Sequence, residues 1–149
     1  MNSDTETTQR LLTQHIPLLR DLPAANNPPM RVTRDTQLRD AITLMMVNDY
    51  SQLPVMQGDR NIEGYISWRS IGEAFALNKE CKIVRDCMRS SIIMLDDNEP
   101  LLSAVSIIAK EDFVLVRNRE KRIVGIVTTS DITSCFYELA EPFFLIGQI

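Results

Sequence analysis

Length, composition and charge set the first limits on what this chain does. Its 149 residues, 44% hydrophobic and 24% charged, are enough for one compact domain or for two small half-domains that share a core. The net charge of −4 disfavours broad electrostatic binding to nucleic acid. The single histidine, His15, excludes a histidine metal cluster and a Ser-His-Asp triad built within one chain.

Targeting patterns and cysteine spacing bear on where the protein works. No apolar run approaches the about 20 residues that a membrane-spanning helix needs, and the polar start MNSDTETTQR is unlike a secretion signal. Cys81, Cys87 and Cys135 are odd in number and lack the paired spacing of a zinc site. We therefore expect a cytoplasmic protein with reduced cysteines, no bound metal and no membrane association.

The first 30 residues are predicted to form a helix and a linker. Apolar residues recur at helical spacing between residues 7 and 22, and Pro17 is expected to interrupt or end this helix. Residues 23–30 contain two adjacent asparagines and two adjacent prolines, which is typical of a linker.

The rest of the chain repeats one pattern of apolar residues. The two copies are residues 36–67 (TQLRDAITLMMVNDYSQLPVMQGDRNIEGYIS) and residues 100–128 (PLLSAVSIIAKEDFVLVRNREKRIVGIVT). Each begins at helical spacing and continues as two short apolar strands around a polar turn. The sequence further predicts first strands at Arg31–Thr33 and Ile92–Leu95, and last helices from Ser67 to about Leu77 and from Thr128 to about Ala140.

Each unit thus has the order strand–helix–strand–strand–helix, which predicts an internal duplication. A unit of this size buries little apolar surface alone, whereas two units related by a pseudo-twofold axis share one core. The predicted fold is α/β (α+β), with small mixed sheets packed between helices. The predicted parts are residues 1–30 (helix and linker), 31–78 (repeat 1), 79–140 (repeat 2) and 141–149 (the start of a C-terminal helix).

The end of the chain is unusually apolar. The last segment, EPFFLIGQI, begins with Pro142 at a plausible first position of a helix and then stops among apolar residues. This indicates either a chain cut from a longer protein or a tail that packs on a partner.

The two copies differ where the last strand meets the last helix. Residues 64–71 (GYISWRSI) and 125–132 (GIVTTSDI) share a glycine, a hydroxyl residue and an isoleucine at matching positions. Ser70 stands where the second copy has Asp131. Only the second copy therefore places a carboxylate at the start of the helix.

The residues of this second junction suit two roles. Free N–H groups at a helix start attract a phosphate, and the two carboxylate oxygens of Asp131 match a vicinal diol, with Thr128 and Ser130 as small donors beside it. The same Thr-x-x-Asp pattern also resembles a capping box, in which Thr128 and Asp131 stabilise only the helix. The sequence leaves both roles open.

The duplicated order resembles a pair of CBS domains, often called a Bateman module. The resemblance covers about residues 16–140 and rests on that order together with SQLPV (51–55), VRDCM (84–88), IIML (92–95) and GIVTTSDI. It implies two pseudo-twofold-related CBS repeats that sense a ligand without catalysis. Such pairs bind adenosine-containing metabolites between the repeats, commonly dimerise, and regulate an attached or partner domain.

The resemblance also implies roles for individual residues. It implies that Asp131 accepts hydrogen bonds from both ribose hydroxyls and that Thr128 and Ser130 face the ribose or phosphate. The further ligand-binding residues expected are Ile126, Ile93 and Phe113.

Repeat 1 is expected to hold a degenerate second site made of Ser67, Arg69 and Ser70. Ser70 is short and neutral, so it cannot clamp a diol as a carboxylate does. Trp68, beside it, is expected to pack against the neighbouring repeat.

The leading hypothesis is a regulatory module that senses an adenosine-containing metabolite (an AMP- or adenosine-type ligand, S-adenosylmethionine, NAD or ATP) and acts through a homodimer on an effector domain or protein. Few positive charges lie near Leu53–Pro54–Val55, which favours a ligand of low charge over ATP unless Arg85 or Arg89 reaches the cleft. The alternative is a structural dimerisation module with no functional ligand site. No catalytic residue, required cofactor or nucleic-acid partner is expected.

Overall fold

The computed structural model describes residues 16–147, with side chains described for residues 16–138. The predicted N-terminal helix lies mostly outside the described residues. Its described end contains the 3-10 helix η1 (Leu19–Asp21), and η2 (Pro23–Asn26) follows in the predicted linker. Ala25 in η2 is fully buried, so these residues are part of the packed structure.

The predicted mixed α+β fold is confirmed. Repeat 1 has a two-stranded antiparallel sheet, and repeat 2 has a three-stranded mixed sheet in the order β3-β4-β5. The first strand expected in repeat 1 is only a single parallel bridge between Val32 and Val55. In chain order, the elements of the repeats are α2 (Leu38–Asn48), β1 (Gln52–Gln57), β2 (Asn61–Ser67), α3 (Trp68–Ala76), η3 (Val84–Asp86), β3 (Met94–Asp96), α4 (Leu101–Glu111), β4 (Phe113–Arg117), β5 (Ile123–Thr128) and α5 (Thr129–Gly147).

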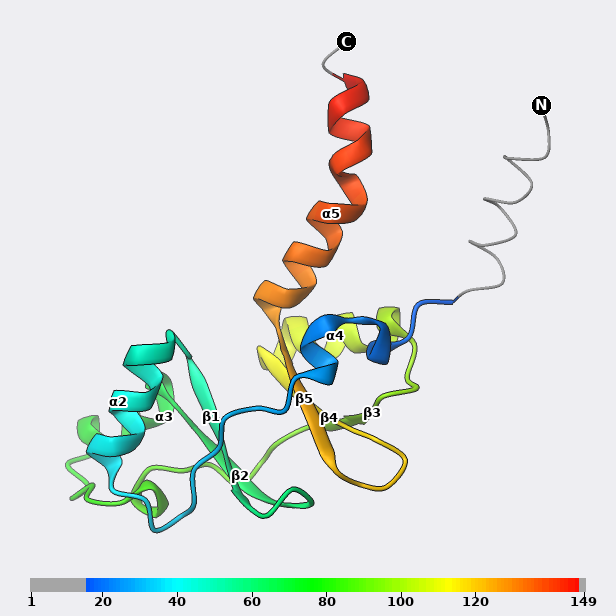
Figure 1. Cartoon of the computed structure of the whole chain (residues 1–149). Coiled ribbons are helices and arrows are strands. Elements are labelled where there is room, and N and C mark those ends of the chain that lie inside the picture. Colours follow the sequence, from blue (N-terminus) through cyan, green and yellow to red (C-terminus); the bar gives the residue numbers. More distant parts are fainter. Residues whose placement is uncertain (1–15, 148–149) are drawn as a thin grey trace, which may run out of the picture.

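The two repeats lie side by side through their sheets, with the helices on the outside (Figure 1). α5 projects away from the body of the molecule and continues through residues 141–147, where the sequence predicted a further helix. Within residues 16–138, no helix has the length and apolar composition that crossing a bilayer requires.

Each repeat has its own buried core, and a third cluster joins the repeats. Met56, Leu115 and Ile123 form the centre of this joining cluster. The hairpin turns meet beside it, where the Ile123 N–H donates to the Asp59 carbonyl at 2.7 Å and the Arg60 Nε donates to the Glu120 carbonyl at 3.1 Å. Burial of these apolar side chains from both sheets fixes the position of one repeat against the other.

The N-terminal segment crosses the repeat boundary and packs on repeat 2. Leu19 and Leu22 are buried in the core of repeat 2 together with residues of α4. The Leu19 N–H donates to the Glu99 carbonyl at 2.8 Å, and the Leu101 N–H donates to the Pro17 carbonyl at 2.9 Å. Repeat 2 is therefore completed by residues that precede repeat 1 in the chain.

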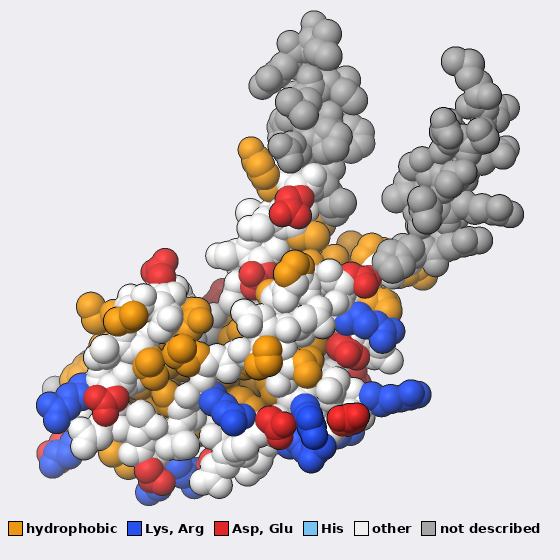
Figure 2. Space-filling view, viewed as in Figure 1, with side chains coloured by type: hydrophobic (Ala, Val, Ile, Leu, Met, Phe, Trp, Pro, Cys, Tyr) orange, Lys and Arg blue, Asp and Glu red, His pale blue; other side chains and the backbone are white. Residues whose placement is uncertain are grey.

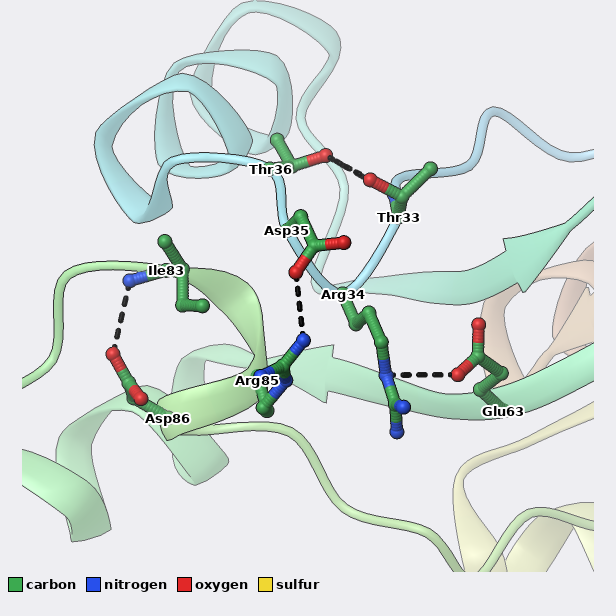
Figure 3. Close-up of polar contacts among 8 residues, drawn as sticks. All are labelled: Thr33, Arg34, Asp35, Thr36, Glu63, Ile83, Arg85 and Asp86. Atoms are coloured by element: carbon green, nitrogen blue, oxygen red, sulfur yellow. Dashed lines mark hydrogen bonds and ion pairs between the residues drawn. The ribbon is translucent and has the colours of Figure 1, made fainter.

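The segment between the repeats packs back on repeat 1 in the corresponding way. Val84 and Cys87 are buried in the core of repeat 1. Polar contacts around η3 hold this segment in place: Arg85 pairs with Asp35 at 2.7 Å, and Asp86 accepts from the Ile83 N–H at 3.0 Å (Figure 3). The same view shows Arg34 of this region paired with Glu63 of β2, at 2.9 Å.

Candidate functional site

A cleft of about 850 Å³ lies between the two repeats. Figure 2 shows hydrophobic side chains in the middle of one face, between the repeats, whereas charged side chains lie mainly along the lower edge. The cleft brings together most of the predicted site residues of both copies. Those that line it are Thr128, Ser130, Asp131, Ile126, Phe113, Ser67 and Arg69.

The predicted residues Ile93 and Ser70 do not line the cleft. Ile93 is partly buried against the core of repeat 2, and its carbonyl accepts from the Leu115 N–H at 2.9 Å. Ser70 is 3% exposed and is buried in the first turn of α3.

At the junction of repeat 2, Asp131 bonds back to the end of β5. Its Oδ2 atom accepts from the Thr128 N–H at 2.8 Å and from the Thr128 Oγ1 hydroxyl at 2.9 Å. Its Oδ1 atom has no protein donor within the part of the chain that the structure describes. The carboxylate thus stabilises the helix start with one oxygen and keeps the other as an acceptor, on a side chain that lines the cleft.

At the junction of repeat 1, Ser67 and Ser70 form a closed capping box. The Ser70 N–H donates to Ser67 Oγ at 3.0 Å, and the Ser67 N–H donates to Ser70 Oγ at 2.9 Å. The Ser70 hydroxyl donates in turn to the Ser67 carbonyl at 3.1 Å. These contacts use the donor of Ser70 and bury the residue, so its hydroxyl is not offered to a ligand.

The backbone around both junctions is nevertheless the same. The Thr129 N–H donates to the Asp112 carbonyl at 3.2 Å, and the Trp68 N–H donates to the Ser51 carbonyl at 3.3 Å. Each pair joins the first residue of a helix to the residue just before the neighbouring strand. The difference between the two junctions therefore lies in their side chains.

Residues of the N-terminal segment form a wall of the cleft that sequence reasoning missed. Ala24 and the run Asn27–Met30 line it, although this segment has the composition of a linker. Gly125 of β5 makes the close approach possible, because a Cβ built there would lie 2.6 Å from the carbonyl carbon of Ala25. The only sequence signal for this contact was the glycine in the last strand, which indicates that some segment approaches closely. It does not indicate which segment that is.

Aromatic side chains from both repeats also line the cleft. Tyr65 of β2 and Phe113 of β4 meet edge to face, with ring centroids 5.0 Å apart and an interplanar angle of 77°. Trp68 lines the cleft and is 42% exposed as a residue, so it is not buried against the neighbouring repeat. The site thus offers ring surface beside the hydroxyl and carboxylate groups.

The charges of the cleft are mostly negative. Four carboxylates against two cationic side chains give the lining a net formal charge of −2. Arg85 and Arg89 do not line the cleft, and they pair instead with Asp35 and Glu73. The charged lining residues are Asp49, Glu111, Asp112, Asp131, Arg69 and Lys110. Across the described residues, no group of three or more His, Cys, Asp or Glu side chains is arranged to hold a metal ion.

The sequence profile of the CBS domain matches residues 19–76 and 84–138, which together make up more than half of the chain. The chain belongs to the CBS domain family. The two matched segments contain the two copies of the repeated pattern, residues 36–67 and 100–128, and this confirms the tandem CBS pair predicted from the sequence.

Curated relatives carry this CBS pair within longer proteins. The chain is 26% identical over 123 residues to the L-aspartate semialdehyde sulfurtransferase of Methanocaldococcus jannaschii. The aligned region covers 81% of this chain and 23% of that protein. It is 26% identical over 115 residues to the choline transport ATP-binding protein OpuBA of Bacillus subtilis. This aligned region covers 76% of this chain and 29% of that protein. The chain therefore spans less than a third of the length of these two relatives.

Solved structures of CBS pairs superpose on the whole two-repeat body. The CBS domain pair of protein MJ0100, in complex with 5′-methylthioadenosine and S-adenosyl-L-methionine, has a TM-score of 0.70 at 26% identity and covers 82% of this chain and 97% of that chain. CBSX2, in complex with AMP, has a TM-score of 0.69 at 18% identity, with the same coverage of 82% and 97%. The likeness to CBSX2 shows the fold alone.

Proposed function

We propose that this CBS pair is a non-catalytic, cytoplasmic regulatory module that binds an adenosine-containing metabolite in the cleft between its repeats. The observation that carries the proposal is the position of Asp131. One of its oxygens caps α5 through Thr128, while the other keeps its acceptor capacity on a cleft-lining side chain. The two hydroxyl groups of a ribose can donate hydrogen bonds to this oxygen and to the hydroxyl oxygens of Thr128 and Ser130.

The shape of the cleft supports a ligand of this class. Its volume of about 850 Å³ lies within the range of about 300–1,000 Å³ that is usual for small-molecule sites. Ile126 and Phe113 provide apolar surface for a base, next to the polar junction of Thr128 and Asp131. The MJ0100 pair, which has the same fold, binds two adenosine compounds. AMP, adenosine, S-adenosylmethionine, NAD and ATP are the candidate ligands.

Regulation is the role that we infer for such binding. In the two longer relatives the matched CBS region is only part of the protein. We therefore propose that this module passes its signal to an effector domain or partner protein, and that the activities of those relatives belong to regions outside the match. Nucleic acid is not proposed as a partner, because the chain is acidic.

Exposed apolar side chains support action through a homodimer. They lie on helices of both repeats and include Val47 and Leu102, each 77% exposed. Exposed apolar surface on helix faces is a common basis for association of identical chains. The exposed apolar side chains on these helices are Met46, Val47, Phe75, Leu102, Phe136 and Tyr137.

Titration calorimetry with the candidate ligands tests the proposal, with Asp131→Asn as the decisive variant. Asparagine keeps a carbonyl oxygen that accepts from Thr128, but it replaces the second acceptor by a donor. We expect the melting temperature to stay close to wild type while affinity falls about tenfold to a hundredfold, as for loss of a hydrogen bond to a charged group.

Ser70→Ala is the matched control, because this residue caps the equivalent helix and does not line the cleft. Its ligand affinity should equal that of wild type. If no candidate ligand binds and the chain still sediments as a dimer, the alternative of a structural dimerisation module is correct.

A further inference from the structure

The cleft has an unusual residue at the start of α3. Trp68 occupies the first position of this helix, where the second copy has Thr129 at the start of α5. Trp68 lines the cleft, and the residue is 42% exposed. A large aromatic ring that is open to a cavity of this size can be covered by a ligand, and an indole face attracts cations more strongly than the other aromatic side chains do.

The charge of the cleft favours a cation over a phosphate. Beyond Asp131, the carboxylates Asp49, Glu111 and Asp112 line it and outnumber the two basic side chains. One of those, Arg69, is 83% exposed and already pairs with Glu73 at 3.4 Å. In a cleft partly closed to water, this excess of negative charge repels anionic ligands and attracts cationic ones.

From these observations we propose that the repeat-1 side of the cleft selects a nucleoside that carries a positively charged substituent, and that Trp68 is a specificity-determining residue that contacts this substituent. The inference rests on the proposed function, because Asp131 is taken to hold the ribose. It adds that the junction without the carboxylate takes part in recognition: it supplies a ring face for the charged part of the ligand, while the cleft carboxylates set the sign of that charge.

A matched pair of ligands isolates the charge. S-adenosylmethionine carries a sulfonium cation, and S-adenosylhomocysteine differs only by loss of the methyl group and of that charge. 5′-Methylthioadenosine adds a neutral nucleoside, and AMP adds an anionic nucleotide. Calorimetry on the full chain should give S-adenosylmethionine at least tenfold tighter binding than S-adenosylhomocysteine, with AMP the weakest of the four.

Two sets of variants then assign the preference to residues. Trp68→Leu should weaken S-adenosylmethionine about tenfold, and it should bring the affinity ratio of the matched pair close to one. Trp68→Phe should retain part of the preference. Leu77→Ala is the control, since Leu77 is an exposed apolar residue at the end of the same helix that does not line the cleft. The double variant Glu111→Gln with Asp112→Asn should weaken S-adenosylmethionine and strengthen AMP.

The outcomes separate the two proposals. Equal binding of the matched pair, or tighter binding of AMP, would overturn the selection for a cation and leave the adenosine-binding function in place. An unchanged affinity ratio in Trp68→Leu would overturn the role of Trp68. Absence of binding by all four ligands would overturn this inference, and absence of binding by adenosine, NAD and ATP as well would overturn the proposed function.

Discussion

Ser70 and Asp131 occupy the same position in two helices that start in the same way. Ser70 is 3% exposed and exchanges its hydrogen bonds with Ser67. Asp131 caps its helix through a single oxygen and remains partly exposed beside the cleft. The comparison shows that capping and ligand binding are not alternatives for Asp131, because capping uses one acceptor and a carboxylate has two. Only the repeat whose cap has a second acceptor keeps the means to hold a diol.

The largest effect is expected at Gly125 of β5, which lets the N-terminal segment with η2 pack closely on this strand. Gly125→Ala should lower the free energy of unfolding by about 3 kcal/mol, because the new Cβ would lie 2.6 Å from two backbone atoms of Ala25. Gly72→Ala is the control, since its Cβ would meet nothing within 4 Å, and alanine favours the helix. Urea unfolding measures both, and equal stability of the two variants would contradict the packing of η2 on β5.

Loss of the repeat-1 cap should have a smaller effect. Ser70→Ala removes the two hydrogen bonds that the buried Ser70 hydroxyl makes with the Ser67 backbone, so the free energy of unfolding should fall by about 1–2 kcal/mol. Asp131→Asn should cost less than this because its cap is retained. The same urea titrations compare the two variants, and a larger loss for Asp131→Asn would mean that the negative charge, and not only the acceptor, stabilises α5.

Acid should destabilise both repeats through one hydrogen-bonded carboxyl in each. Backbone N–H donors from Ile83 and Lys82 lower the pKa of Asp86, and the hydrogen bond from Arg117 lowers the pKa of Asp96. A carboxyl whose folded pKa is lowered stabilises the protein above its unfolded pKa of about 4, and this contribution is lost as the pH falls through the folded value.

Melting temperatures from pH 7 to pH 3 test this linkage. The acid-induced decline should be shallower in Asp86→Asn and in Asp96→Asn than in wild type, since neither variant can take up that proton. Parallel curves for wild type and both variants would show that these carboxyls do not contribute to acid sensitivity.

The smallest effect is expected from restoring the missing carboxylate. Ser70→Asp should not create a second ligand site, because position 70 is buried and Trp68 replaces Thr129 at the start of the helix. Calorimetry should give one ligand per chain in this variant and in wild type. A stoichiometry of two would show that a single side chain separates the two junctions.

Local patterns in the sequence were enough to predict the repeated architecture. The helical spacing before Leu53–Pro54–Val55 and Val114–Val116, followed by a polar turn and a glycine-bearing strand, appears in both repeats of the structure. Periodicity and turn residues act over a few positions, so they can be read along the chain. The difference between Ser70 and Asp131 was visible for the same reason.

The tertiary structure decided which residues surround the cleft. Ile93 is one of the ligand-binding residues expected from the sequence, yet it packs on the core of repeat 2. The run Asn27–Met30 has the composition of a linker, yet it forms a wall of the cleft. The cause is the crossing of the N-terminal segment onto repeat 2, which depends on close backbone contact between Gly125 and Ala25. Contacts between residues about 100 positions apart leave no periodic signal, so the sequence determined the elements and the cap chemistry while packing determined the site.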